Sequence, residues 1–302
     1  MRIAFAGTPL AAVPTLTALL ASEHEVAFVV TRPDAPAGRG RTLTASPIAE
    51  AAGVSGVPVL KTAHLADHKE RFADVDCVIV VAFGAMVPRD LLDTPQHGWI
   101  NVHCSLLPQW RGAAPVQYAI LSGDELTGVT TFRIDEGLDT GPILAYLTTP
   151  IQPSETSSQL LDRLSIEGAQ LALATLTGVE NGSILPLHQP IDGISQAPKI
   201  TVADARVRWN EPALAIERRI RAVTKEPGAW TMFGQTRIKL NPVSVLPQVK
   251  DLVPGQVELR DGEVLVGTGS HAVVLAEVHE AGRNITPAKT WLGNQTSPVV
   301  FE

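Results

Sequence analysis

Cysteine and long hydrophobic runs are scarce in this 302-residue chain. Its two cysteines, Cys77 and Cys104, cannot build a disulfide framework, and no Cys/His spacing indicates zinc, so we predict no metal site. No segment approaches the roughly 18 consecutive apolar residues of a membrane helix, and the apolar run in residues 1–7 is too short for a secretion signal. We therefore expect a cytoplasmic protein with no membrane partner.

Positive charge is not in excess either, because the net charge is −7. Residues 1–199 carry 12 Lys and Arg against 20 Asp and Glu, whereas residues 200–302 carry 12 against 11. The global balance argues against a nucleic-acid partner, but the near-neutral C-terminal part can still bind phosphates with modest salt-sensitive affinity. Aromatics available there for base stacking are few, which favours contacts to an RNA backbone over base reading. They are Trp209, Trp230, Phe233 and Trp291.

The glycine fingerprint of dinucleotide-binding proteins is missing. Residues 3–6 read as a strand and residues 10–21 as a helix, but the turn between them is Gly-Thr-Pro and not GxGxxG, which disfavours a dinucleotide. The continuous apolar run 78–81 is typical of a parallel strand covered on both faces. A chain of this length is usually too long to fold around a single hydrophobic core. We therefore expect an α/β domain with a mostly parallel sheet followed by a second domain.

The most polar cluster after a predicted strand is INVHCSLLPQWRGAAP, residues 100–115. Strand alternation sends Asn101 and His103 to the same face, and ligands in open α/β sheets bind just beyond the carboxyl ends of strands. A single Asn or His on a strand is more often structural, so the assignment to chemistry needs a second segment. A Cys104 nucleophile beside His103 is disfavoured, since adjacent strand residues point to opposite faces.

The second segment is GVTTFRIDEGLDTGPIL, residues 128–144. It reads as a strand followed by an acidic, glycine-broken turn that contains Asp135, Glu136 and Asp139. Asn101, His103 and Asp139 together make a plausible oxyanion donor, acid or base, and orienting carboxylate. We predict these three as the catalytic residues.

Two further stretches leave alternatives open. The loop RPDAPAGRGRTLT, residues 32–44, is either a solvated connection or a basic arm that orders on a phosphate backbone. The helix predicted at 212–223 carries arginines that are either a solvated face or phosphate contacts. After residue 230, short strands and turns recur in a rhythm that fits a small barrel or sandwich.

Several motifs together resemble the methionyl-tRNA formyltransferase family. They are AGTP at 6–9, AFG at 82–84, NVHCSLLPQWRGAAPVQYAI at 101–120, DEGLDTGPI at 135–143, PGAW at 227–230 and GRN at 282–284. The resemblance implies a Rossmann-like formyltransferase domain at 1–189, a linker at 190–205 and an OB-like β-barrel that binds tRNA at 206–302. It also implies transfer of the formyl group of 10-formyltetrahydrofolate to the α-amino group of initiator methionyl-tRNA. We expect a monomer, although the sequence does not reveal the oligomeric state.

The resemblance also implies binding residues, carried over by position. Ser105, Leu106, Leu107 and Pro108, together with Phe83 and Gly84, would border the folate, and Arg39 and Arg41 would belong to the tRNA-facing loop. Arg111 is either structural or a contact of the aminoacyl end.

Three alternatives remain from the sequence. A formyltransferase acting on a nucleotide sugar or purine precursor would need neither the 32–44 loop nor the C-terminal half. An NAD(P)-dependent oxidoreductase lacks its glycine fingerprint and a Tyr/Lys spacing here. A non-enzymatic RNA-binding module leaves the Asn/His/Asp set without a role.

Overall fold

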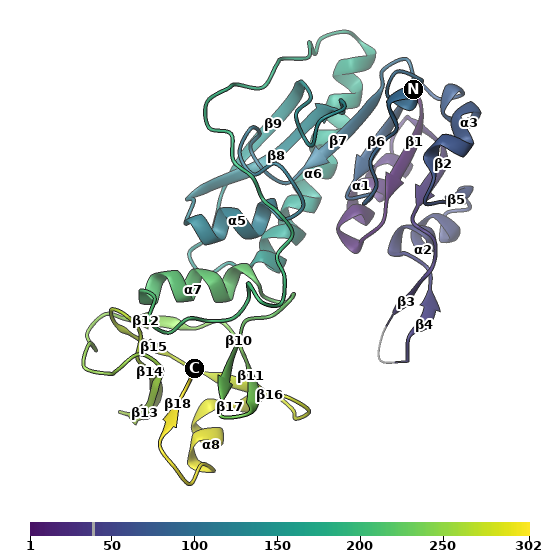
Figure 1. The fold of residues 1–302 in the computed structure, drawn as a ribbon. Helices are drawn as coiled ribbons and strands as arrows, with labels where there is room; N and C mark the ends of the chain where they lie inside the picture. The colour runs from purple at the N-terminus through teal and green to yellow at the C-terminus, as the bar shows by residue number, and fades with distance from the viewer. Residues whose placement is uncertain (38–39) are drawn as a thin grey trace. The chain divides into compact units, whose positions relative to one another are not determined.

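The computed structural model describes residues 1–37 and 40–302, so the predicted tRNA contact Arg39 lies outside the described residues. The chain forms two compact units, and Figure 1 labels most of their helices and strands. The first comprises residues 1–115, 126–150 and 161–196, and the second comprises residues 116–125, 151–160 and 197–302. Two helices, α5 (Pro115–Ser122) and α6 (Ser157–Glu180), contribute residues to both units. The three-part division at 189 and 205 stays a prediction.

The first unit is built on a seven-stranded sheet. Five adjacent strands run parallel, the sixth pairs antiparallel with the fifth, and the seventh pairs antiparallel with the sixth. In spatial order the strands are β5 (Val59–Lys61), β2 (Glu25–Thr31), β1 (Arg2–Gly7), β6 (Cys77–Val81), β7 (Trp99–His103), β8 (Leu126–Arg133) and β9 (Ile143–Pro150). All five residues of β6 are buried, as the continuous apolar run predicts. The predicted Rossmann-like, mostly parallel sheet is confirmed.

Short helices connect these strands. They are η1 (Leu10–Ala12), α1 (Val13–Leu20), α2 (Pro47–Val54), η2 (Leu65–His68), α3 (Lys69–Ala73) and α4 (Arg89–Leu92). Between β2 and α2, a hairpin of β3 (Ala35–Ala37) and β4 (Thr42–Thr44) stands apart from the main sheet. The part of the predicted arm that the structure describes is therefore a β-hairpin.

Strand β7 is anchored at its first residue. Trp99 is fully buried, its ring centroid lies 4.8 Å from that of Phe72, and its Nε1 donates a hydrogen bond of 2.8 Å to the Leu91 carbonyl. A buried indole that fills space and satisfies its N–H fixes both the height and the rotation of the strand. The start of β7 is thereby held in place. Its other end, with Asn101 and His103, lies where the parallel strands of the sheet have their carboxyl ends.

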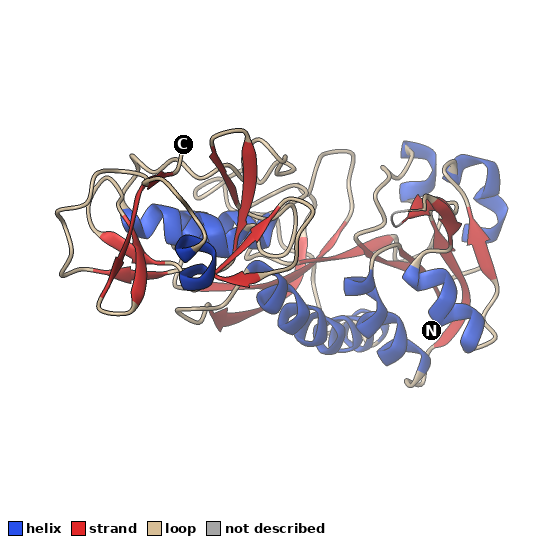
Figure 2. Cartoon of the chain, turned by 90° about the horizontal axis from the view of Figure 1, so that it is seen from below, coloured by secondary structure: helices blue, strands red, loops and turns tan. Residues whose placement is uncertain are grey.

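Besides its parts of α5 and α6, the second unit contains antiparallel strands, drawn red in Figure 2, and two further helices. One sheet has the order β10 (Trp230–Phe233), β11 (Thr236–Leu240), β16 (Glu277–Glu280) and β17 (Thr286–Pro287). The other has the order β12 (Ser244–Leu246), β15 (Ala272–Val274), β14 (Glu263–Val266), β13 (Gln256–Arg260) and β18 (Val299–Val300). The helices are α7 (Ala213–Ala222) and α8 (Ala288–Gly293). The predicted C-terminal β-domain is confirmed.

Two of the aromatics proposed for stacking on RNA belong to the core of this unit. Trp209 and Trp291 are each 4% exposed, and both lie against Phe301 at centroid distances of 5.5 and 5.8 Å. Both rings belong to the hydrophobic core cluster of this unit, where each aromatic side chain buries a large apolar area. The expectation that these two rings are available to bases is wrong.

Candidate active site

Asn101 and His103 lie two residues apart at the carboxyl end of β7, on the same face of the strand. The register pairs Asn101 with Val80 of β6 and Phe132 of β8, and His103 with Thr130 of β8. His103 is only 6% exposed, whereas Asn101 is half-buried. The predicted common face for the two side chains follows from this strand geometry.

The hydrogen bonds of His103 define its tautomer. Its Nε2 lies 2.9 Å from the Trp110 carbonyl oxygen, which can only accept, so Nε2 carries a proton. Burial lowers the pKa of His103 below its usual 6.5, while Asp139 and the Trp110 carbonyl oppose that shift. The ring is therefore neutral near pH 7, and its Nδ1 offers a free lone pair.

Asp139 meets His103 from the turn between β8 and β9. Its Oδ2 lies 3.9 Å from His103 Nδ1 and accepts a 2.7 Å hydrogen bond from the Gly112 N–H. The backbone at Asp139 has φ of 53°, in the left-handed region, which an Asp adopts more readily than most residues. The structure thus brings His103 and Asp139 together, as the sequence predicts.

The turn that carries Asp139 is closed by its own residues. Asp135 Oδ1 accepts from the Thr140 hydroxyl at 2.6 Å and from the Gly137 N–H at 3.0 Å. At Gly141 a Cβ would lie 1.8 Å from the Arg133 carbonyl oxygen, so only glycine permits this close approach. The acidic, glycine-rich pattern therefore serves the turn itself as well as the carboxylate at its tip.

The predicted folate-bordering residues 105–108 directly follow β7. Ser105 is fully buried, and its hydroxyl donates to the Gln109 carbonyl at 2.6 Å. Thr130 on β8 ties the segment down, because its hydroxyl donates to the Ser105 carbonyl at 2.7 Å and accepts from the Leu107 N–H at 3.2 Å. Leu107 is buried and Leu106 half-buried, and a cis peptide joins Leu107 to Pro108. The segment is held rigidly at the sheet edge.

Phe83 and Gly84 follow β6, the parallel neighbour of β7, so they lie at the same edge of the sheet. The ring of Phe83 is 2% exposed and packs in the core, and its carbonyl accepts a 2.9 Å hydrogen bond from Thr8. Gly84 has φ of 81°, and a Cβ there would meet no atom within 4 Å. This segment offers its backbone and open space, and not an aromatic face.

Arg41, the predicted tRNA contact that the structure describes, lies elsewhere in the first unit. Arg41 is exposed on the β3–β4 hairpin, which follows β2, and β1 and β6 separate β2 from β7.

Burial raises the pKa of the Cys104 thiol to about 12, so a thiolate nucleophile at neutral pH is disfavoured. This adds to the argument from strand alternation, which points Cys104 and His103 to opposite faces.

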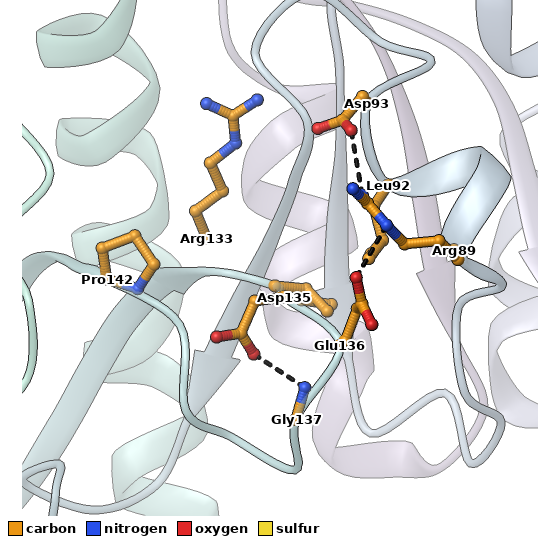
Figure 3. Close-up of a pocket in the computed structure, with 9 residues that line it drawn as sticks. Arg89, Leu92, Asp93, Arg133, Asp135, Glu136, Gly137 and Pro142 are labelled. Carbon is orange, nitrogen blue, oxygen red and sulfur yellow. Dashed lines mark hydrogen bonds and ion pairs between the residues drawn. The ribbon is translucent and has the colours of Figure 1, made fainter.

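A surface pocket of about 380 Å³ is lined in part by Asp135, Glu136 and Gly137 of the β8–β9 turn (Figure 3). Arg89 crosses it, with Nε 2.7 Å from a Glu136 carboxylate oxygen and Nη1 3.0 Å from Asp93 Oδ2. The full lining is Arg89, Leu92, Asp93, Arg133, Ile134, Asp135, Glu136, Gly137 and Pro142. It includes none of the predicted site residues, although residues 134–137 and 142 share the turn with Asp139.

Two residues that the sequence reading missed contact the site from a segment predicted largely as linker. Gln189 bonds to Arg111 and to the turn at Asp139, and Ser195 bonds to Trp110. Neither sits in a periodic pattern or a recognisable motif, so no sequence signal points to them. Within residues 1–37 and 40–302, no group of three or more His, Cys, Asp or Glu could hold a metal, and no helix is long and apolar enough to cross a membrane.

Family models match both parts of the chain. A formyl transferase model covers residues 1–176, and a formyl transferase C-terminal domain model covers residues 199–295. The chain belongs to the formyl transferase family. The resemblance stated from the motifs is confirmed by a relative named methionyl-tRNA formyltransferase from Streptomyces coelicolor, which is 53% identical over 296 residues, or 96% of each chain.

Solved structures at lower identity share the formyl transferase fold. An N-formyltransferase from Helicobacter canadensis is 18% identical with a TM-score of 0.71, covering 91% of this chain and 98% of that one. HypX from Aquifex aeolicus is 21% identical with a TM-score of 0.67 over 97% of this chain. This chain spans about half of the HypX chain, 47% of its length.

Proposed function

We propose that this formyl transferase moves the formyl group of 10-formyltetrahydrofolate to the α-amino group of methionine on initiator tRNA. The observation that carries the proposal is that 53% identity to a methionyl-tRNA formyltransferase extends over 96% of both chains. A similarity confined to the first unit would support only the chemistry of formyl transfer. Its extent supports the tRNA acceptor as well.

The residues at the end of β7 fit the chemistry of attack on a formyl carbon. Bound at this edge, the folate supplies the activated one-carbon unit. Two features suit the binding of such a molecule. There is open space beside Gly84, and segment 105–108 is held in place by the hydrogen bond from Thr130. The Asn101 amide donates a hydrogen bond to the formyl oxygen as negative charge develops there. Fixed donors are effective in this role because they need no reorganisation during the reaction.

His103 and Asp139 manage the proton of the attacking amine. The Nε2 proton of His103 is committed to the Trp110 carbonyl, so Nδ1 accepts the proton that the amine loses. Asp139 Oδ2, 3.9 Å away, then faces an imidazolium and stabilises its charge. No covalent bond between the protein and the formyl group is needed.

Basic side chains outside the site are suited to bind the phosphates of the acceptor tRNA. Arg41 is exposed on the β3–β4 hairpin, and we propose that it and Arg39 contact the acceptor end. In the second unit, Arg206 and Arg237 stack on the ring of Trp230, with Cζ at 5.5 and 4.0 Å from its centroid. Guanidinium groups held in this way suit contacts to phosphate. We further propose that the protein acts as a monomer in the cytoplasm, without a metal.

A small amine acceptor is the alternative, because the fold is also that of an N-formyltransferase solved with folinic acid and dTDP-3-aminofucose. The two are separated by acceptor choice. With 10-formyltetrahydrofolate as donor, we expect formylation of charged initiator methionyl-tRNA at a kcat/KM at least about tenfold above charged elongator methionyl-tRNA, and none of free methionine. Formylation of a nucleotide-linked amino sugar without product on tRNA would overturn the proposal.

A further inference from the structure

Residues 187–196 belong to the first unit and form hydrogen bonds with the two stretches that carry the site residues. Leu187 exchanges two backbone hydrogen bonds, 2.7 and 2.8 Å, with Ile143 at the start of β9. Eight residues later, Ser195 accepts from the Arg111 N–H at 3.0 Å and donates its own N–H to the Pro108 carbonyl at 3.4 Å. The segment is therefore held at one end to the start of β9, directly after the turn that carries Asp139, and at the other end to residues 108–111.

Gln189 lies between these two attachments and connects them with its amide. The amide oxygen accepts from Arg111 Nε at 3.1 Å and Nη2 at 2.6 Å. The amide nitrogen donates to the carbonyls of Asp139 and Gly141, each at 2.8 Å. Only a side chain that offers an acceptor and donors together makes all four bonds, and an amide does.

The hydrogen bonds from Gln189 to the turn hold Asp139, whose backbone lies in the left-handed region. Asp139 holds φ of 53°, and its carbonyl oxygen is one of the two that Gln189 fixes. Its carboxylate is held separately by the Gly112 N–H, which follows Arg111, the other partner of Gln189. The Asp139 backbone and the Asp139 carboxylate are therefore held by two different hydrogen bonds. The side-chain amide of Gln189 makes the first and bonds to Arg111, the residue before the Gly112 donor of the second.

Ser195 acts on the His103 side of the pair. Its hydroxyl accepts from the Trp110 N–H at 2.9 Å, and Trp110 holds φ of 61°. The Trp110 carbonyl is in turn the acceptor for His103 Nε2 at 2.9 Å. One segment thus reaches both members of the His103 and Asp139 pair without touching either of their reacting atoms.

We propose that Gln189 is a positioning residue for formyl transfer: it holds the turn so that the Asp139 carboxylate faces His103 Nδ1, and Ser195 supports the imidazole from the opposite side. This inference rests on the function proposed above. It gives Gln189 and Ser195 a role in holding the site, although the segment that carries them reads from the sequence mainly as a connection between domains.

The test compares Gln189→Leu and Gln189→Glu with Gln196→Leu and Gln196→Glu, the same two changes at an exposed glutamine of the same segment. Leucine removes all four bonds at similar volume, whereas glutamate keeps the acceptor for Arg111 and loses both donors. For both Gln189 variants we expect kcat to fall roughly ten- to a hundredfold, because small misplacements of catalytic groups are costly. KM for folate and for tRNA should stay within about threefold, and the Gln196 variants should match the parent enzyme.

A second readout distinguishes positioning from general destabilisation. Among the described residues, Asp139 is the charged group that raises the pKa of His103, so moving its carboxylate away lowers that pKa further. We expect the acid limb of the kcat profile of Gln189→Leu to shift to lower pH, which a loss of stability by itself does not produce. Unchanged kcat in Gln189→Leu would overturn the inference, as would parental kcat in Gln189→Glu, or a kcat loss matched by lost Tm with no pH shift.

The inference can fail separately from the proposed function. NMR titration of the His103 ring needs no acceptor, so it reports on the His103–Asp139 geometry even if the parent enzyme leaves methionyl-tRNA unformylated. A lower pKa of His103 in Gln189→Leu, with no change in Gln196→Leu, supports the positioning role in that case too. Identical titration curves for Gln189→Leu and the parent would refute it.

Discussion

Asp139→Asn is expected to lower kcat by about 10² to 10⁴, the usual cost of removing a general acid or base or the group that supports it. Asparagine tolerates the left-handed backbone at φ of 53°, and its side-chain oxygen still accepts from the Gly112 N–H. The turn should therefore keep its shape. What disappears is the negative charge 3.9 Å from His103 Nδ1, which stabilises the imidazolium formed when the amine loses its proton.

The matched control is Asp192→Asn, the same change at an exposed carboxylate of the same unit. Formylation of methionyl-tRNA is followed at saturating substrates for both variants, with circular dichroism and Tm to establish folding. We expect the Asp192 variant to match the parent enzyme. Full turnover by folded Asp139→Asn would remove Asp139 from the catalytic set.

The pH dependence of turnover should report on His103. Burial lowers its pKa below 6.5, so the neutral ring that accepts a proton persists to lower pH than an exposed histidine would. We expect the acid limb of kcat to have its midpoint below pH 6.5, and to lie lower still in Asp139→Asn, where the charge that raises this pKa is gone. His103→Gln should lose about 10² to 10⁴ in kcat together with this limb.

The same pKa difference affects folding. Below pH 6.5 the unfolded chain binds a proton at His103 that the folded chain resists, so this residue makes stability fall as the pH drops from 6.5 toward the folded pKa. Above pH 6.5 neither state is protonated there, and the contribution vanishes. Urea unfolding at pH 7.5 and 5.5 should show a smaller acid loss for His103→Gln than for the parent. A larger loss would contradict the lowered pKa.

Much of the site follows from local sequence rules. A two-residue spacing places Asn101 and His103 on one strand face, and the acidic glycine-rich turn brings a carboxylate to the end of the neighbouring strand. These features depend on short-range geometry, which the order of residues dictates. The parallel sheet follows for the same reason, from continuous apolar runs such as that of β6.

Other features depend on contacts between segments far apart in the chain. Gln189 is 78 residues from Arg111, and Ser195 is 85 from Trp110. A polar segment punctuated by proline and glycine has no periodicity that would predict such partners. The burial of Trp209 and Trp291 was missed for a related reason, since an aromatic residue reads alike whether it fills a core or faces a ligand.

The measurement that tests the central claim most directly is formyl transfer from 10-formyltetrahydrofolate to initiator methionyl-tRNA by four proteins: the parent, Asp139→Asn, His103→Gln and the double variant. If His103 and Asp139 act as one proton-handling unit, the parent forms formylmethionyl-tRNA, and the double variant is no slower than the slower single variant within about threefold. A parent enzyme without product on tRNA would contradict the account. So would a double variant whose loss is the product of the two single losses, because the two residues would then act independently.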